Sequence, residues 1–177
     1  MIDDLYSGRI LALAANMPRA GRLEMSPPLG YWMGTGEQVA KLCGSKAVVD
    51  IKLDIWGTTV LDFAQDVKAC ALGQAAAAVL GGAIVGGSVA EVRQARREMA
   101  AMLKEGGDGP TGRFEGLRAL KIVAEYPARH ASTLVALDAT IKAIDNALEY
   151  WEVPCILAVE GRIGSPTDDD DRTRRAG

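Results

Sequence analysis

The sequence contains few of the residues that build disulfide frameworks and metal centres. It has three cysteines and one histidine among 177 residues. An odd and small number of cysteines argues against a disulfide framework and favours a reducing compartment, in which thiols serve in chemistry or packing. We therefore expect a cytoplasmic protein whose cysteines are reduced.

The sequence also lacks a strong excess of charge of one sign and any long apolar run. Lys and Arg number 20 against 23 Asp and Glu, which gives a net charge of −3. That balance does not predict binding to nucleic acid or to an anionic membrane. No apolar run approaches the roughly 20 residues that span a bilayer, and Met1–Asp4 lacks the basic start of a signal peptide. We expect neither nucleic acid nor a membrane as a partner.

Alternating apolar and polar residues mark the clearest strands. Residues 47–54 and 58–67 alternate in this way, with Gly57 at the turn between them. Two such neighbouring runs predict an antiparallel hairpin. The Pro- and Gly-rich residues 16–36 are expected to be irregular, with a short strand near 29–33. The sequence thus predicts a small antiparallel sheet of three strands.

The remaining segments have helical periodicity, which together with the sheet predicts an α+β fold with helices packed on one face. Ser88 and Glu91 form the pattern of a capping box at the start of one helix. Ser132 is expected at the cap or in the first turn of the last helix. The expected helices cover residues 5–14, 71–85 with an interruption at Gly81-Gly82, 88–105, 113–125 and 131–151.

Two cysteines stand at the ends of the predicted strands. Cys43 precedes the first strand of the hairpin, and Cys70 follows the second strand where an Ala-rich helix begins. Antiparallel pairing places these two positions at the same end of the sheet. A helix N-terminus favours a thiolate, and two thiols together suit a soft metal. A purely structural role as small buried hydrophobes is the alternative.

On this order of elements, the sequence resembles the U-type iron–sulfur cluster scaffolds, the group of the NifU N-terminal domain, IscU and SufU. The resemblance implies a SufE/NifU-like α+β fold for a scaffold-like domain over residues 1–152. It leaves 153–177 as a C-terminal extension whose charged end is expected to be disordered. The matching stretches are Leu5-Tyr6-Ser7 with Pro18-Arg19 and Gly21, Cys43-Gly44-Ser45, Ala69-Cys70-Ala71, and Tyr126-Pro127-Ala128-Arg129 with Thr133–Ala139.

The chain departs from the family pattern at the ligand positions. The third cysteine of the family falls on Ser132, and the aspartate of its Cys-Gly-Asp segment falls on Ser45. The family histidine falls on Ala131, one place after His130. The resemblance therefore implies Cys43, Cys70, Ser132 and His130 as cluster-binding residues, with Cys43, Cys70 and His130 as metal ligands. Cys155, in an apolar run beyond the matching part, is a less favoured third ligand.

The resemblance implies a non-enzymatic scaffold or carrier that accepts iron and sulfur and passes on a cluster. A transient [2Fe–2S] cluster or zinc is the implied cargo or cofactor, and an absence of both stays open. A cysteine desulfurase and recipient apoproteins are the implied partners. Two alternatives stay open: a module that docks a desulfurase without holding a cluster, and a thiol relay for sulfur.

Overall fold

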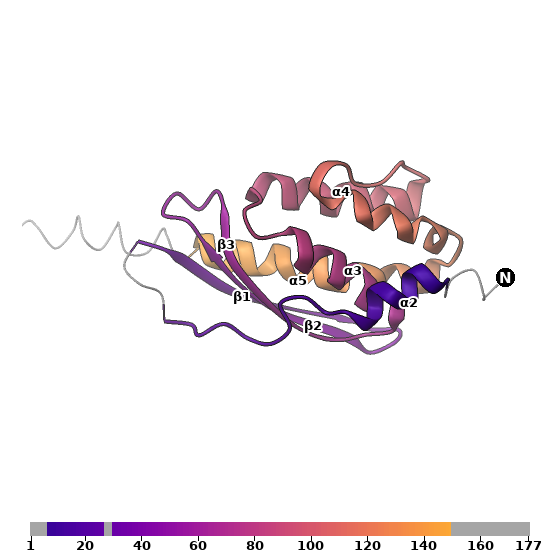
Figure 1. Ribbon diagram of the computed structural model, residues 1–177, viewed down its shortest axis with the longest axis horizontal. Helices are drawn as coiled ribbons and strands as arrows, with labels where there is room; N and C mark the ends of the chain where they lie inside the picture. The colour runs from indigo at the N-terminus through magenta and orange to yellow at the C-terminus, as the bar shows by residue number, and fades with distance from the viewer. Residues whose placement is uncertain (1–6, 27–29, 150–177) are drawn as a thin grey trace, which may run out of the picture.

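A computed structural model describes residues 7–26 and 30–149. Within them a three-stranded sheet carries a layer of helices on one face, and a second helical layer packs outside the first (Figure 1). The predicted α+β architecture is confirmed. In chain order the elements are α2 (Gly8–Ala15), β1 (Trp32–Ala40), β2 (Ser45–Leu53), β3 (Val60–Lys68), α3 (Ala71–Ala83), α4 (Val89–Glu105), the 3-10 helix η1 (Gly112–Glu125) and α5 (Pro127–Glu149).

The sheet is an antiparallel meander in the order β1-β2-β3. The predicted hairpin is confirmed as β2 and β3, with a register irregularity between Lys52 and Leu53 where the strands approach their turn. The third strand was predicted too early and too short. It is β1, which pairs with β2 along its whole length, from Trp32 opposite Leu53 to Ala40 opposite Ser45.

Two glycines explain why the predicted strand stopped short of the end of β1. Gly34 and Gly36 lower the strand propensity of the segment, yet both lie in the strand, on the face that α5 covers. A Cβ atom on Gly34 would lie 2.1 Å from the carbonyl oxygen of Ala143, and one on Gly36 equally close to that of Ala139. Glycine in β1 thus lets α5 approach the backbone of the sheet.

The core lies between the sheet and the helices. α5 packs across β1 and β2, α3 packs beside α5 and against β3, and α4 and η1 cover the outer side of α3 and α5 (Figure 1). Burial of these faces is the main favourable contribution to folding. The largest fully buried side chains are Phe63, Phe114, Ile10, Ile51, Leu53, Leu72, Leu80, Ile84, Met99, Met102, Leu117 and Leu120.

Asp50 lies on the other face of the sheet, where alternation placed it toward solvent, but it is fully buried. Arg22, in the segment that follows α2, donates two hydrogen bonds to its carboxylate at 2.5 and 2.9 Å. The Thr35 hydroxyl and the Leu23 N–H donate at 2.6 and 3.0 Å. Burial disfavours the charge, but these hydrogen bonds outweigh it and lower the pKa of Asp50. The pairing anchors residues 19–26 over the sheet.

Two predicted helix boundaries were wrong for identifiable reasons. α3 continues through Gly81 without interruption, because Gly81 packs close to the Gln65 amide and the Pro18 carbonyl oxygen, where a side chain would not fit. α5 begins at Pro127 rather than at 131, since proline suits the first position of a helix. The capping box of Ser88 and Glu91 at the start of α4 is confirmed. The proposed extension, residues 153–177, lies outside the described residues.

Candidate thiol site

The order of strand pairing brings the two cysteines to one end of the sheet. Cys43 lies in the turn between β1 and β2, where its N–H donates to the carbonyl oxygen of Ala40. Gly44 closes this turn with a φ of +69°, a conformation that glycine adopts without strain. Cys70 is the N-cap residue of α3, two positions after Lys68, which pairs with Lys46 of β2. The pairing of β2 with its two neighbouring strands therefore places both cysteines at the same end of the sheet.

Ser132 lies between the two thiols. The Cys70 thiol donates to the Ser132 hydroxyl over 3.6 Å, and the same hydroxyl is close enough to Cys43 to lower its pKa. The Cys43 thiol donates to the Ser45 hydroxyl over 3.1 Å. The site thus joins two sulfur atoms and two hydroxyl groups from three elements of the fold.

The electrostatic surroundings of Cys43 favour its thiolate. Hydrogen bonding to the Ser45 side chain is the largest cause that lowers the pKa of Cys43, followed by the Ser45 backbone. Smaller contributions come from the Ser132 hydroxyl and from the charge of Arg129, and they act against desolvation. A serine hydroxyl both donates and accepts, so it reorients toward the sulfur when the thiol proton leaves. Cys43 is also exposed, which makes it the accessible thiol of the pair.

The serine at position 132 is held deep in the fold. Ser132 is fully buried in the second turn of α5, not at its cap, because the helix begins five residues earlier at Pro127. Its hydroxyl donates to the carbonyl oxygen of Arg129 at 2.9 Å. A Cβ atom on Gly73 would lie 2.6 Å from the Ser132 carbonyl oxygen. Gly73, which sequence reasoning missed, lets α3 and α5 cross where the thiols meet.

The imidazole of His130 contacts the end of η1 rather than the two thiols. Its Nε2 lies 3.1 Å from the carbonyl oxygen of Val123 and 3.3 Å from that of Ala124, so this nitrogen is used at the end of η1. In the described part of the chain, no group of three or more His, Cys, Asp or Glu side chains is arranged to hold a metal ion. The structure brings together Cys43, Cys70 and Ser132 but does not bring His130 to them. Cys155 lies outside the described residues.

The arrangement has a definite chemical capacity. Two thiols in one place bind soft metals and accept sulfur, whereas a serine hydroxyl is a harder and much less acidic ligand. A metal ion bound here would be coordinated by two protein sulfur atoms, and its other coordination positions would stay open. The fit to an iron–sulfur cluster is therefore partial.

Comparison with known proteins places this chain in a family. The structure of a nitrogen-fixing NifU-like protein (N-terminal) from Brucella abortus is 42% identical, and the match covers 84% of this chain and 97% of that chain with a TM-score of 0.76. The chain belongs to the NifU-like family. The resemblance inferred from the sequence is thereby confirmed, although no family model and no curated protein matches the chain.

More distant structures share the fold of this NifU-like chain. A putative iron–sulfur cluster assembly scaffold protein for the SUF system, from Fervidobacterium islandicum, is 19% identical over 79% of this chain and 96% of that one, with a TM-score of 0.68. A hypothetical protein is 18% identical over 81% and 98%, with a TM-score of 0.64. None of the described helices is both long and apolar enough for a membrane span.

Proposed function

We propose that this protein is an iron–sulfur cluster assembly scaffold or carrier, which accepts iron and sulfur at the thiol site and passes the cluster to recipient apoproteins. The observation that supports this most directly is the meeting of Cys43 and Cys70 at Ser132, in a chain of the NifU-like family. The Brucella protein supports the family, and the Fervidobacterium protein is named as an assembly scaffold.

The cargo in this proposal is a transient [2Fe–2S] cluster held through Cys43 and Cys70. Thiolates are the ligands that iron–sulfur clusters require, and binding releases the thiol protons. The lowering of the pKa of Cys43 by its hydrogen bonds to Ser45 reduces the cost of that release. Because Ser132 and Ser45 supply oxygen in place of sulfur and carboxylate, the cluster is bound weakly, and an incoming thiol of a recipient completes the coordination. A labile cluster suits a carrier.

The sulfur donor in this proposal is a cysteine desulfurase that meets the exposed turn of Cys43. Leu42, the residue before Cys43, is 82% exposed and offers an apolar contact beside the accepting thiol. Recipient apoproteins use the same turn, since it gives access to the cluster edge.

The test is anaerobic reconstitution with ferrous iron and sulfide, followed by visible absorbance and by transfer to an apo-ferredoxin. Wild type is expected to develop sulfide-to-iron absorption bands and to activate the recipient. Cys43→Ser and Cys70→Ser are each expected to lose the bands, while Cys155→Ser retains them as the matched control. Wild type without bands, in protein that is folded by circular dichroism, would refute the scaffold proposal.

A docking module without a cluster is the second candidate, because the described residues hold no set of three His, Cys, Asp or Glu donors. It predicts that wild type binds a cysteine desulfurase but shows neither cluster absorption nor tight zinc binding. A thiol relay predicts a different result, a persulfide on Cys43 in mass spectra after incubation with desulfurase and cysteine, with no cluster formed.

A further inference from the structure

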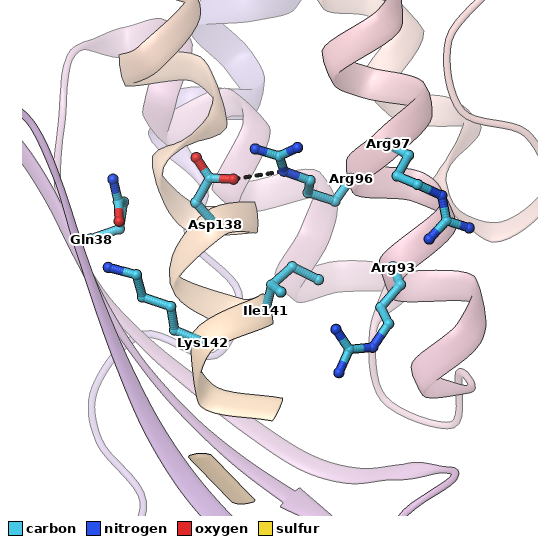
Figure 2. A pocket seen from close by; sticks show the side chains of 7 residues that line it. All are labelled: Gln38, Arg93, Arg96, Arg97, Asp138, Ile141 and Lys142. Carbon is cyan, nitrogen blue, oxygen red and sulfur yellow. Dashed lines mark hydrogen bonds and ion pairs between the residues drawn. The ribbon is translucent and has the colours of Figure 1, made fainter. Parts of the chain in front are cut away.

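A basic groove runs between α4 and α5, away from the thiol site. Its volume is about 350 Å³. Figure 2 shows the side chains of Arg93, Arg96 and Arg97 on α4, and those of Asp138, Ile141 and Lys142 on α5. Gln38 of β1 closes the groove beside Lys142. The side chains that line it include four cations and a single carboxylate.

The charges of the basic groove are only partly compensated. Arg96 pairs with Asp138 at 2.7 Å, and Arg93 pairs with Asp145 at 2.5 Å. In the described part of the chain, Arg97 makes no ion pair or hydrogen bond, and the Lys142 ammonium donates only to the carbonyl oxygen of Glu37, at 3.0 Å. An arginine side chain has five N–H donors, and Arg93 and Arg96 use few of theirs in these pairs. The groove therefore favours an occupant with several carboxylates.

We infer that the basic groove binds the acidic run Asp168–Asp171 of this same chain. These residues are four consecutive aspartates and lie C-terminal to α5, the helix that forms one wall of the groove. Four carboxylates facing two incompletely paired arginines, one unpaired arginine and one lysine give complementary charge. Ile141 is the apolar side chain among the residues that line the groove.

The connection is long enough for this contact. α5 ends at Glu149, and Asp138 lies about 17 Å before that end along the helix axis, at 1.5 Å per residue. Residues 150–167 span at most about 60 Å when fully extended. The connection is therefore long enough for the acidic run to reach the groove. Attachment to the same chain gives such a contact an effective concentration in the millimolar range for short flexible connections.

Occupation of the basic groove is independent of cluster assembly. Asp138 lies six residues after Ser132, about 9 Å along α5 and on another side of the helix. The run in the groove would cover Arg93 and Arg97 and leave Cys43 accessible. The inference therefore stands or falls without reference to the thiol chemistry.

The experiment measures access to the acidic run in the full-length protein. Endoproteinase Asp-N cleaves before Asp168, and mass spectrometry reports the rate at low salt. Arg97→Glu removes no ion pair or hydrogen bond of the described residues and reverses one charge of the groove; it is expected to raise the rate about threefold or more. Arg9→Glu makes the same charge change on α2 and is expected to match wild type. At 0.5 M salt the difference is expected to disappear, with a free peptide of residues 150–177 correcting for the protease itself.

A second measurement does not depend on proteolysis. In spectra of protein labelled with ¹⁵N-arginine, replacing all four aspartates 168–171 by Asn is expected to shift the Nε–H resonances of Arg93 and Arg97. Equal cleavage of wild type and Arg97→Glu at low salt, with unmoved resonances, would overturn the inference. Protection that grows with protein concentration would assign the run to the groove of a second copy. An exposed run, together with resonances that shift when a tetra-aspartate peptide is added, would assign the groove to another protein instead.

Discussion

One helix, α5, takes part in two regions that differ in how much change they tolerate. Along its middle it packs directly on the backbone of β1, where Gly34 and Gly36 leave no room for a side chain. Near its N-terminal end it presents the Ser132 hydroxyl to two thiols: it accepts from Cys70 over 3.6 Å, and it contributes to the lowered pKa of Cys43. The contact of α5 with β1 requires that positions 34 and 36 have no side chain. The thiol site instead depends on which donor atoms a few side chains supply.

This difference separates the fold from the ligand set. A close-packed interface is sensitive to added volume, because protein interiors are as dense as organic crystals. Replacing the Ser132 hydroxyl by another group of one heavy atom changes a donor and adds far less volume than a new side chain at Gly36. The fold of this NifU-like chain thus accommodates a serine at position 132 beside two cysteines.

The largest effect, on stability, is expected from Gly36→Val, which adds a side chain where β1 packs against α5. The new side chain would overlap the backbone of α5 at Ala139, so we expect destabilisation by about 4 kcal/mol or more and loss of soluble protein. Urea unfolding monitored by circular dichroism measures it. Gly8→Ala, at a helical position with nothing within 4 Å, is the control and is expected to change stability by less than about 1 kcal/mol. A stable, soluble Gly36→Val would show that the interface is looser than described.

An intermediate effect is expected from Ser132→Cys, which changes a donor without changing the packing. A third thiolate beside Cys43 and Cys70 approaches the sulfur-rich ligand set of structural zinc sites, so zinc should bind at least about tenfold more tightly, which corresponds to about 1.4 kcal/mol. Calorimetric titration measures it. Thr133→Cys is the control, since Thr133 is equally buried but lies about 100° around the helix. Equal weak binding by all three proteins would favour the docking module, and tight binding by wild type would mean that a ligand has been missed.

The smallest effect is expected from Ser45→Ala, which removes the main hydrogen bond to Cys43. The wild-type pKa of Cys43 lies below its usual value because of Ser45, so the variant should have a higher pKa and less thiolate at neutral pH. Alkylation of Cys43 by iodoacetamide, followed by peptide mass spectrometry between pH 6 and 10, should shift to higher pH and slow a few-fold at pH 7. Ser132→Ala, a weaker contributor, should shift the profile less. An unshifted profile for Ser45→Ala would contradict the assigned cause.

Much of the architecture was predictable because it is encoded locally. Alternation identified β2 and β3, the pattern of Ser88 and Glu91 identified the start of α4, and the order of elements predicted that Cys43 and Cys70 share one end of the sheet. Ser132 was assigned to the third ligand position from the residues on either side of it, and the structure places it between the thiols.

The sequence by itself determined the strands and helices that have a clear hydrophobic periodicity. It also determined which side chains are available as hydrogen-bond donors or metal ligands. Only the tertiary structure decided the roles that depend on contacts between distant segments. It placed the glycines of β1 in a strand because α5 packs there, and it buried Asp50 because Arg22 reaches it from 28 residues away. It also turned His130 toward η1 and assembled the basic groove from α4 and α5. Such contacts join residues far apart in the chain, so no local pattern records them.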